Sequence, residues 1–67
     1  MKIDYANAII QIRVKLDLSQ MALAELLGVS FSSVNRWENG KYEPTKLVKK
    51  KIEIICKEND IQLVEVK

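Results

Sequence analysis

Residues 19–44 constrain the fold most, because two short helical patterns flank a single glycine there. The first pattern, residues 19–27, begins with a hydroxyl residue suited to capping free backbone N–H groups. The second starts at residue 30 and ends at Asn39-Gly40. Between them, Gly28 can adopt the positive φ at which helices commonly stop. The segment therefore predicts two short helices joined by a tight turn.

A further helix is predicted before this pair, with Asp4 as its N-cap. Ile9, Arg13 and Leu16 fall at positions i, i+4 and i+7, so they share one face of that helix. Arg13 therefore lies within an apolar stripe. A charge in that position needs a partner.

A fourth helix is predicted over residues 46–58, after a loop bracketed by Gly40 and Pro44 and with Thr45 as its cap. Its apolar residues recur at helical spacing or lie beside that stripe, and they are Leu47, Val48, Ile52, Ile55 and Cys56. We expect this helix to close the core and Cys56 to be a buried, small apolar residue. Residues 61–66 are rich in β-branched side chains, which favours a strand.

These patterns predict an all-α fold class, namely a compact four-helix domain with a short strand-like C-terminal tail. Sixty-seven residues leave room for one domain, 1–67, with its core in residues 4–58 and its tail in residues 59–67. No apolar run approaches about 20 residues, and no basic-then-apolar signal segment opens the chain, so we expect a cytoplasmic protein that is not inserted in a membrane.

Histidine is absent and Cys56 is the single cysteine, which argues against a zinc site and an internal disulfide. The commonest general base is missing as well, and the chain has no glycine-rich phosphate loop. We therefore expect neither a metal, nor a cofactor, nor an enzyme.

Positive charge gathers just after the two short helices. Residues 1–40 hold four positive and four negative side chains, whereas residues 41–51 hold five lysines against Glu43 alone. By itself a lysine run most often marks a solvated helix face. After such a helix pair it favours phosphate contacts, which dominate the affinity of proteins for DNA.

Several residues at fixed spacing resemble the lambda-repressor-like (Cro-type) helix-turn-helix family of phage repressors and small bacterial regulators. They are Gln20, Leu23-Ala24, Gly28-Val29-Ser30, Val34, Trp37-Glu38-Asn39-Gly40 and Pro44. The resemblance covers about residues 6–58 and implies a bundle of four or five helices, usually a homodimer, whose third helix lies in the major groove. The chain departs from the family in having Met21 and Ala22 where many relatives have acidic residues, and a strand-like tail instead of a fifth helix.

The helical positions from Phe31 onward sort by chemistry. At about 100° per residue, one arc of about 140° holds Phe31, Ser32, Asn35, Arg36 and Asn39. Val34 and Trp37 lie on the far side as core residues. The predicted base-reading residues are Phe31, Ser32, Asn35 and Arg36. Arg36 suits guanine, Asn35 suits adenine and Phe31 suits a thymine methyl group, while Ser32 specifies weakly. The alternative is an ordinary polar face with one exposed aromatic residue.

Predicted phosphate contacts surround this face and comprise Ser19, Gln20, Asn39, Lys41 and Lys46. By resemblance, Gln20 either binds the DNA backbone or braces a residue of the third helix, and the alternative is an ordinary exposed residue. The resemblance also implies a partly buried structural ion pair between Arg13 and Glu38.

The sequence thus predicts a sequence-specific regulator, acting as a repressor, that binds double-stranded DNA with two half-sites as a homodimer. Pairing of two copies of residues 61–66 is the preferred dimer contact, and packing of the tail within its own chain is the alternative. A different class of function is an antitoxin or accessory subunit that binds another protein through the tail or through Met21, Ala22 and Leu26.

Overall fold

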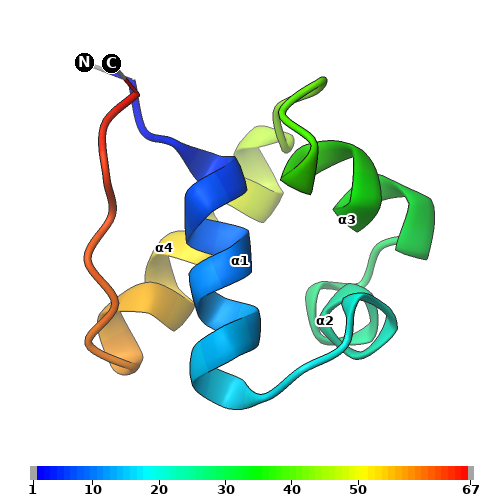
Figure 1. Ribbon diagram of the computed structural model, residues 1–67, viewed down its shortest axis with the longest axis horizontal. Helices are drawn as coiled ribbons and strands as arrows, with labels where there is room; N and C mark the ends of the chain where they lie inside the picture. Colours follow the sequence, from blue (N-terminus) through cyan, green and yellow to red (C-terminus); the bar gives the residue numbers. More distant parts are fainter. Residues whose placement is uncertain (1, 67) are drawn as a thin grey trace.

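The computed structural model describes residues 2–66, which form four helices and an extended tail (Figure 1). The helices are α1 (Tyr5–Leu16), α2 (Gln20–Leu27), α3 (Phe31–Glu38) and α4 (Lys46–Glu58). The predicted all-α fold class is confirmed. Positions 1 and 67, the ends of the predicted domain and tail, lie outside the described residues. Within residues 2–66 no helix is both long enough and apolar enough to span a membrane.

Each helix begins where its cap predicts. The side chains of four capping residues accept a hydrogen bond from the backbone N–H three residues later, at 3.0–3.4 Å. These caps are Asp4, Ser19, Ser30 and Thr45. A cap of this kind typically stabilises a helix by about 1 kcal/mol. The start of every helix is therefore encoded locally by one short polar side chain.

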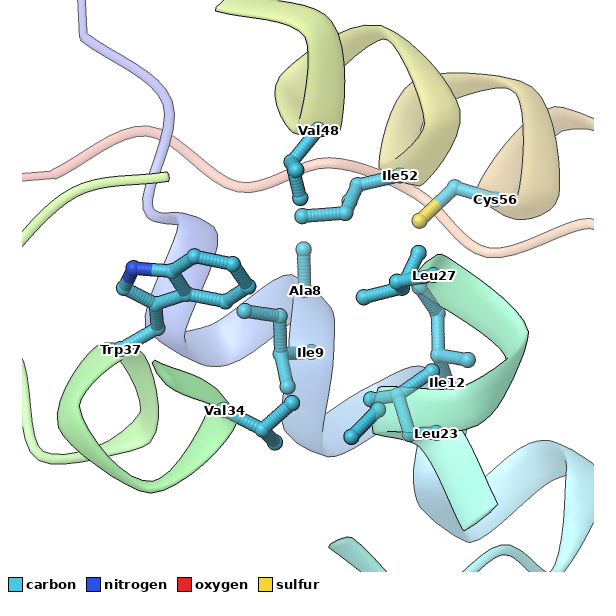
Figure 2. Packing of buried hydrophobic residues seen from close by; sticks show 11 residues of the cluster. Ala8, Ile9, Ile12, Leu23, Leu27, Val34, Trp37, Val48, Ile52 and Cys56 are labelled. Atoms are coloured by element: carbon cyan, nitrogen blue, oxygen red, sulfur yellow. The ribbon is translucent and has the colours of Figure 1, made fainter. Parts of the chain in front are cut away.

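All four helices contribute to one hydrophobic core (Figure 2). The buried residues are Ala8, Ile9 and Ile12 of α1, Leu23, Ala24 and Leu27 of α2, Val34 and Trp37 of α3, and Val48, Ile52 and Cys56 of α4. Cys56 is buried as predicted. The expectation that Leu47 helps close the core is wrong, since it is 69% exposed. It lies about 100° around α4 from the stripe of residues 48, 52 and 56, and so points to solvent.

The tail packs within its own chain. Asp4 N donates a hydrogen bond to Val64 O at 2.7 Å, and Val66 N donates to Lys2 O at 2.8 Å, on either side of an antiparallel bridge between Ile3 and Glu65. The tail runs back past α1 to this segment (Figure 1). Two of its side chains, Ile61 and Leu63, pack against the core.

Packing of residues 61–66 within their own chain is the alternative named for this segment, and pairing of two copies stays a prediction. The segment before α1 is extended and offers backbone groups to the tail, a partner that the sequence pattern did not indicate. Among residues 2–66, strand character is limited to this one bridge.

Candidate nucleic-acid interface

Helix α3 presents a polar face to solvent and buries its opposite side. Ser32, Asn35 and Arg36 are exposed and Phe31 is 48% exposed, whereas Val34 is completely buried. Trp37, on the same inner side as Val34, is 8% exposed, and both point into the core (Figure 2). The predicted base-reading residues therefore lie together on the free surface of one short helix.

The turn between α2 and α3 is fixed by backbone geometry. Gly28 has φ +72°, in the left-handed region, and Val29 N donates to Ala24 O at 2.9 Å. Lys51 Nζ donates to Leu27 O at 3.1 Å, which satisfies one of the free carbonyl groups at the end of α2. These contacts hold α3 at a defined angle to α2.

Arg13 and Glu38 meet between α1 and the end of α3. Arg13 Nη1 donates to Glu38 Oε1 at 2.9 Å and to Oε2 at 3.0 Å, and Arg13 Nε donates to Leu18 O at 3.1 Å. The Arg13 side chain is 29% exposed and that of Glu38 is 10% exposed. The charge within the apolar stripe of α1 thus has a close, shielded partner.

A chain of side-chain amides connects this ion pair to the exposed face of α3. Gln20 Nε2 donates to Glu38 Oε1 at 3.0 Å, Asn35 Nδ2 donates to Gln20 Oε1 at 3.3 Å, and Asn39 Nδ2 donates to Asn35 Oδ1 at 3.2 Å. A carboxylate only accepts hydrogen bonds, so Glu38 sets the direction of the whole chain. Asn35 retains one N–H and one acceptor position for another partner.

Of the two roles that the resemblance implies for Gln20, the contacts correspond to bracing a residue of the third helix. Both ends of its amide are engaged by Glu38 and Asn35. The hydroxyl oxygen of Ser19 accepts from Ala22 N at 3.0 Å, which leaves its O–H available as a donor.

The remaining predicted phosphate contacts lie at and beyond the end of α3. Asn39 caps the helix, and Gly40 has φ +74°, which turns the chain away from the helix axis. Lys41 and Lys46 are exposed, and neither makes an ion pair with a described residue. Their ammonium groups are therefore available to an external anion.

Other lysines near these are engaged within the protein. Lys49 Nζ lies 3.3 Å from a Glu43 oxygen and 5.1 Å from the centre of the Tyr5 ring, and Lys2 Nζ lies 3.4 Å from the other Glu43 oxygen. The hydrogen bond from Lys49, followed by the contact with Lys2, lowers the pKa of Glu43. Glu43 thus keeps its negative charge but shares it with two cations.

One contact on the exposed face was not predicted from the sequence. The Arg36 guanidinium lies over the ring of Tyr42, with Cζ 5.7 Å from the ring centre. Tyr42 is 62% exposed and belongs to the loop between α3 and α4. The signal available was an aromatic residue in a loop of polar and small residues, two positions after a turn-forming glycine.

Within residues 2–66 no cluster of three histidine, cysteine, aspartate or glutamate side chains is arranged to hold a metal ion. The chemistry on offer at this surface is hydrogen bonding, positive charge and one aromatic contact. Those groups suit the edges of bases and the phosphates of a duplex.

A helix-turn-helix family model matches residues 9–61. The match covers most of the chain, including all of α2, α3 and α4, and the chain belongs to the lambda-repressor-like, Cro-type helix-turn-helix family. This is a family of DNA-binding regulators. The searches of curated proteins and of solved structures found no match.

Proposed function

We propose that this protein is a sequence-specific regulator of transcription that places α3 in the major groove of double-stranded DNA. The observation that carries this proposal is the division of α3 into a buried apolar side and an exposed side bearing Phe31, Ser32, Asn35 and Arg36. A helix held so firmly on one side can present the other as a rigid reading surface.

Each base-reading residue has a chemical role in this proposal. The Arg36 guanidinium donates two hydrogen bonds to guanine O6 and N7. The free N–H of Asn35 donates to adenine N7, and its amide oxygen accepts from the adenine N6 amino group. Phe31 packs against a thymine methyl group. Ser32 makes an adaptable contact of low specificity.

Phosphate contacts flank the base-reading residues and set the register of the protein on the duplex. In our proposal the Ser19 hydroxyl and the N-terminus of α2 bind one phosphate, and Asn39, Lys41 and Lys46 bind the backbone beyond the other end of α3. Gln20 acts here through Asn35, whose amide it orients.

We further propose that the protein acts as a homodimer on two half-sites and represses by occupying promoter DNA. In the Ile3–Glu65 bridge the hydrogen bonds come from the flanking residues, so the N–H and C=O of Glu65 face away from the segment before α1. That outer edge of the tail can pair with the same edge of a second copy.

Sedimentation tests the dimer. We expect a dimer mass at micromolar concentration, weakened by Glu65→Pro, which removes the outward N–H, and unaffected by Glu65→Ala, which keeps it. A monomer mass for the unmodified protein would contradict the dimer.

DNA binding itself is tested by titrating salt against affinity on random duplexes and on duplexes enriched by the protein from a random pool. We expect a linear fall of log K with log salt concentration on both, and tighter binding to the enriched duplex by at least about 10³. Equal affinity for both would contradict sequence-specific reading.

The alternative, a subunit whose main partner is another protein, has a weaker basis. Met21 and Leu26 are both more than half exposed, but they lie about 140° apart around α2 and share no apolar stripe. Binding that is independent of salt, or absent on every duplex, would favour this alternative.

A further inference from the structure

We propose that Tyr42 is a positioning residue for Arg36 and thereby determines specificity at the base pair that Arg36 reads. This inference rests on the proposed DNA-binding function. Its basis is the cation–π contact that places the Arg36 guanidinium over the Tyr42 ring, with Cζ 5.7 Å from the ring centre.

The loop after α3 is built to bring the ring to this place. Gly40 has φ +74°, Gly40 N donates to Trp37 O at 3.1 Å, and Lys41 N donates to Arg36 O at 3.3 Å. The chain therefore turns back over the last turn of α3 as it leaves the helix. Tyr42 follows two residues after the glycine, next to the side chain that it contacts.

Core packing does not explain the ring. Tyr42 is 62% exposed and does not belong to the buried cluster or to the partly buried residues around it. Tyrosine is a residue type enriched at binding interfaces, where its ring makes contacts and its hydroxyl stays in water.

A cation–π contact suits a base-reading arginine better than an ion pair would. Arg36 forms neither a salt bridge nor a side-chain hydrogen bond with the residues that the structure describes. The cation–π contact with the Tyr42 ring gives the guanidinium N–H groups no hydrogen-bond acceptor, whereas a carboxylate would occupy them. The ring also limits the rotamers of a long side chain before DNA binds, which lowers the entropy lost on binding.

The test compares Tyr42→Leu, which removes the ring, with Tyr42→Phe, which removes only the hydroxyl. Affinities are measured for the enriched duplex and for random duplexes, alone and in an Arg36→Ala background. Tyr42→Leu is expected to weaken binding to the enriched duplex about two- to fivefold, with little change on random DNA. Tyr42→Phe should bind like the unmodified protein, and Tyr42→Leu should have no further effect once Arg36 is alanine.

A readout without DNA accompanies these measurements. In the free protein, the ring current of Tyr42 should shift the side-chain proton resonances of Arg36, and this shift should persist in Tyr42→Phe and vanish in Tyr42→Leu. Thermal unfolding of Tyr42→Leu should match that of the unmodified protein, because the ring is exposed.

Three results would overturn the proposal. The first is that Tyr42→Leu prefers the enriched duplex over random duplexes by the same factor as the unmodified protein. The second is an equal loss on all DNA by Tyr42→Phe, which would mean that the hydroxyl binds a phosphate. The third is absence of the ring-current shift. If the unmodified protein binds the enriched and random duplexes equally, the proposed function is wrong, and the proposed role of Tyr42 is wrong for that reason.

Discussion

Gln20 donates a hydrogen bond from Nε2 to Glu38 Oε1 at 3.0 Å, and this contact joins the Arg13–Glu38 ion pair to the exposed side of α3. Because the Glu38 carboxylate can only accept, the amide oxygen of Gln20 is left to face Asn35. A charge held between α1 and α3 thus controls how an exposed asparagine is oriented.

Replacement of Gln20 by alanine should therefore change specificity more than stability. Loss of one hydrogen-bonded brace costs about 1 kcal/mol, equivalent to about a fivefold weaker preference for the base pair read by Asn35. That base pair is the position in the enriched duplex at which substitution no longer changes the affinity of the Asn35→Ala variant. Glu25→Ala, an exposed change on the same helix, serves as the control and should leave the preference intact. An unchanged preference in Gln20→Ala would mean that the brace does not act on Asn35.

Arg13→Ala should destabilise the fold. It leaves the Glu38 carboxylate, 10% exposed, without its cation, and such losses typically cost about 3 kcal/mol. In a domain of this size the melting temperature should fall by at least about 10 °C. Lys15→Ala removes an exposed charge from the same helix and should have almost no effect. If the melting temperature of Arg13→Ala is unchanged, the pair is not structural.

Lys41→Ala should weaken binding to all duplexes by a similar factor and reduce the slope of log K against log salt by about 1. The reason is that Lys41 is exposed beyond α3 and, among the described residues, has no ion-pair partner. Lys57→Ala, in the last turn of α4, is the matched control and should preserve the slope. A selective loss on one sequence would instead place Lys41 among the base readers.

Tyr5 should ionise at higher pH than an ordinary tyrosine. Burial raises its pKa, and the hydrogen bond that its hydroxyl donates to Glu53 Oε2 at 3.0 Å raises it further. Since the folded-state pKa lies above that of the unfolded chain, about 10, the contribution of Tyr5 to stability is present below that pH. This contribution is lost as the pH rises through the folded-state pKa.

Ultraviolet absorbance of the tyrosinate measures this ionisation in a Tyr42→Phe background, where Tyr5 is the single tyrosine. Unfolding in denaturant supplies the reference value. Coincident titration of the folded and unfolded chains would show that the Tyr5 hydroxyl is not held by Glu53.

The sequence predicts the helices well because their signals are local. Asp4 and Ser30 mark helix starts through bonds to residues three positions away, and Gly28 marks a stop through its own φ. The core follows from helical spacing, except where a single apolar residue such as Leu47 lies off the buried stripe. Contacts between residues only a few positions apart in the chain can therefore be predicted from the sequence.

Contacts between residues far apart in the sequence, or within loops, are harder to predict. The tail pairs with the segment before α1 through backbone groups, which carry no sequence signal of their own. The Arg36–Tyr42 contact depends on how a loop turns after Gly40, and periodicity says nothing about loops. The link from Gln20 to Asn35 needs the angle between two helices, which the sequence does not specify.

The central claim, that α3 reads bases from the major groove through Arg36, is tested most directly by removing one major-groove acceptor at a time. Each guanine of the enriched duplex is replaced by 7-deazaguanine, which lacks N7 and changes nothing in the minor groove. We expect one guanine in each half-site at which the unmodified protein loses about fivefold in affinity and Arg36→Ala loses nothing further. Equal sensitivity of both proteins at every guanine, or no sensitivity at any, would contradict the claim.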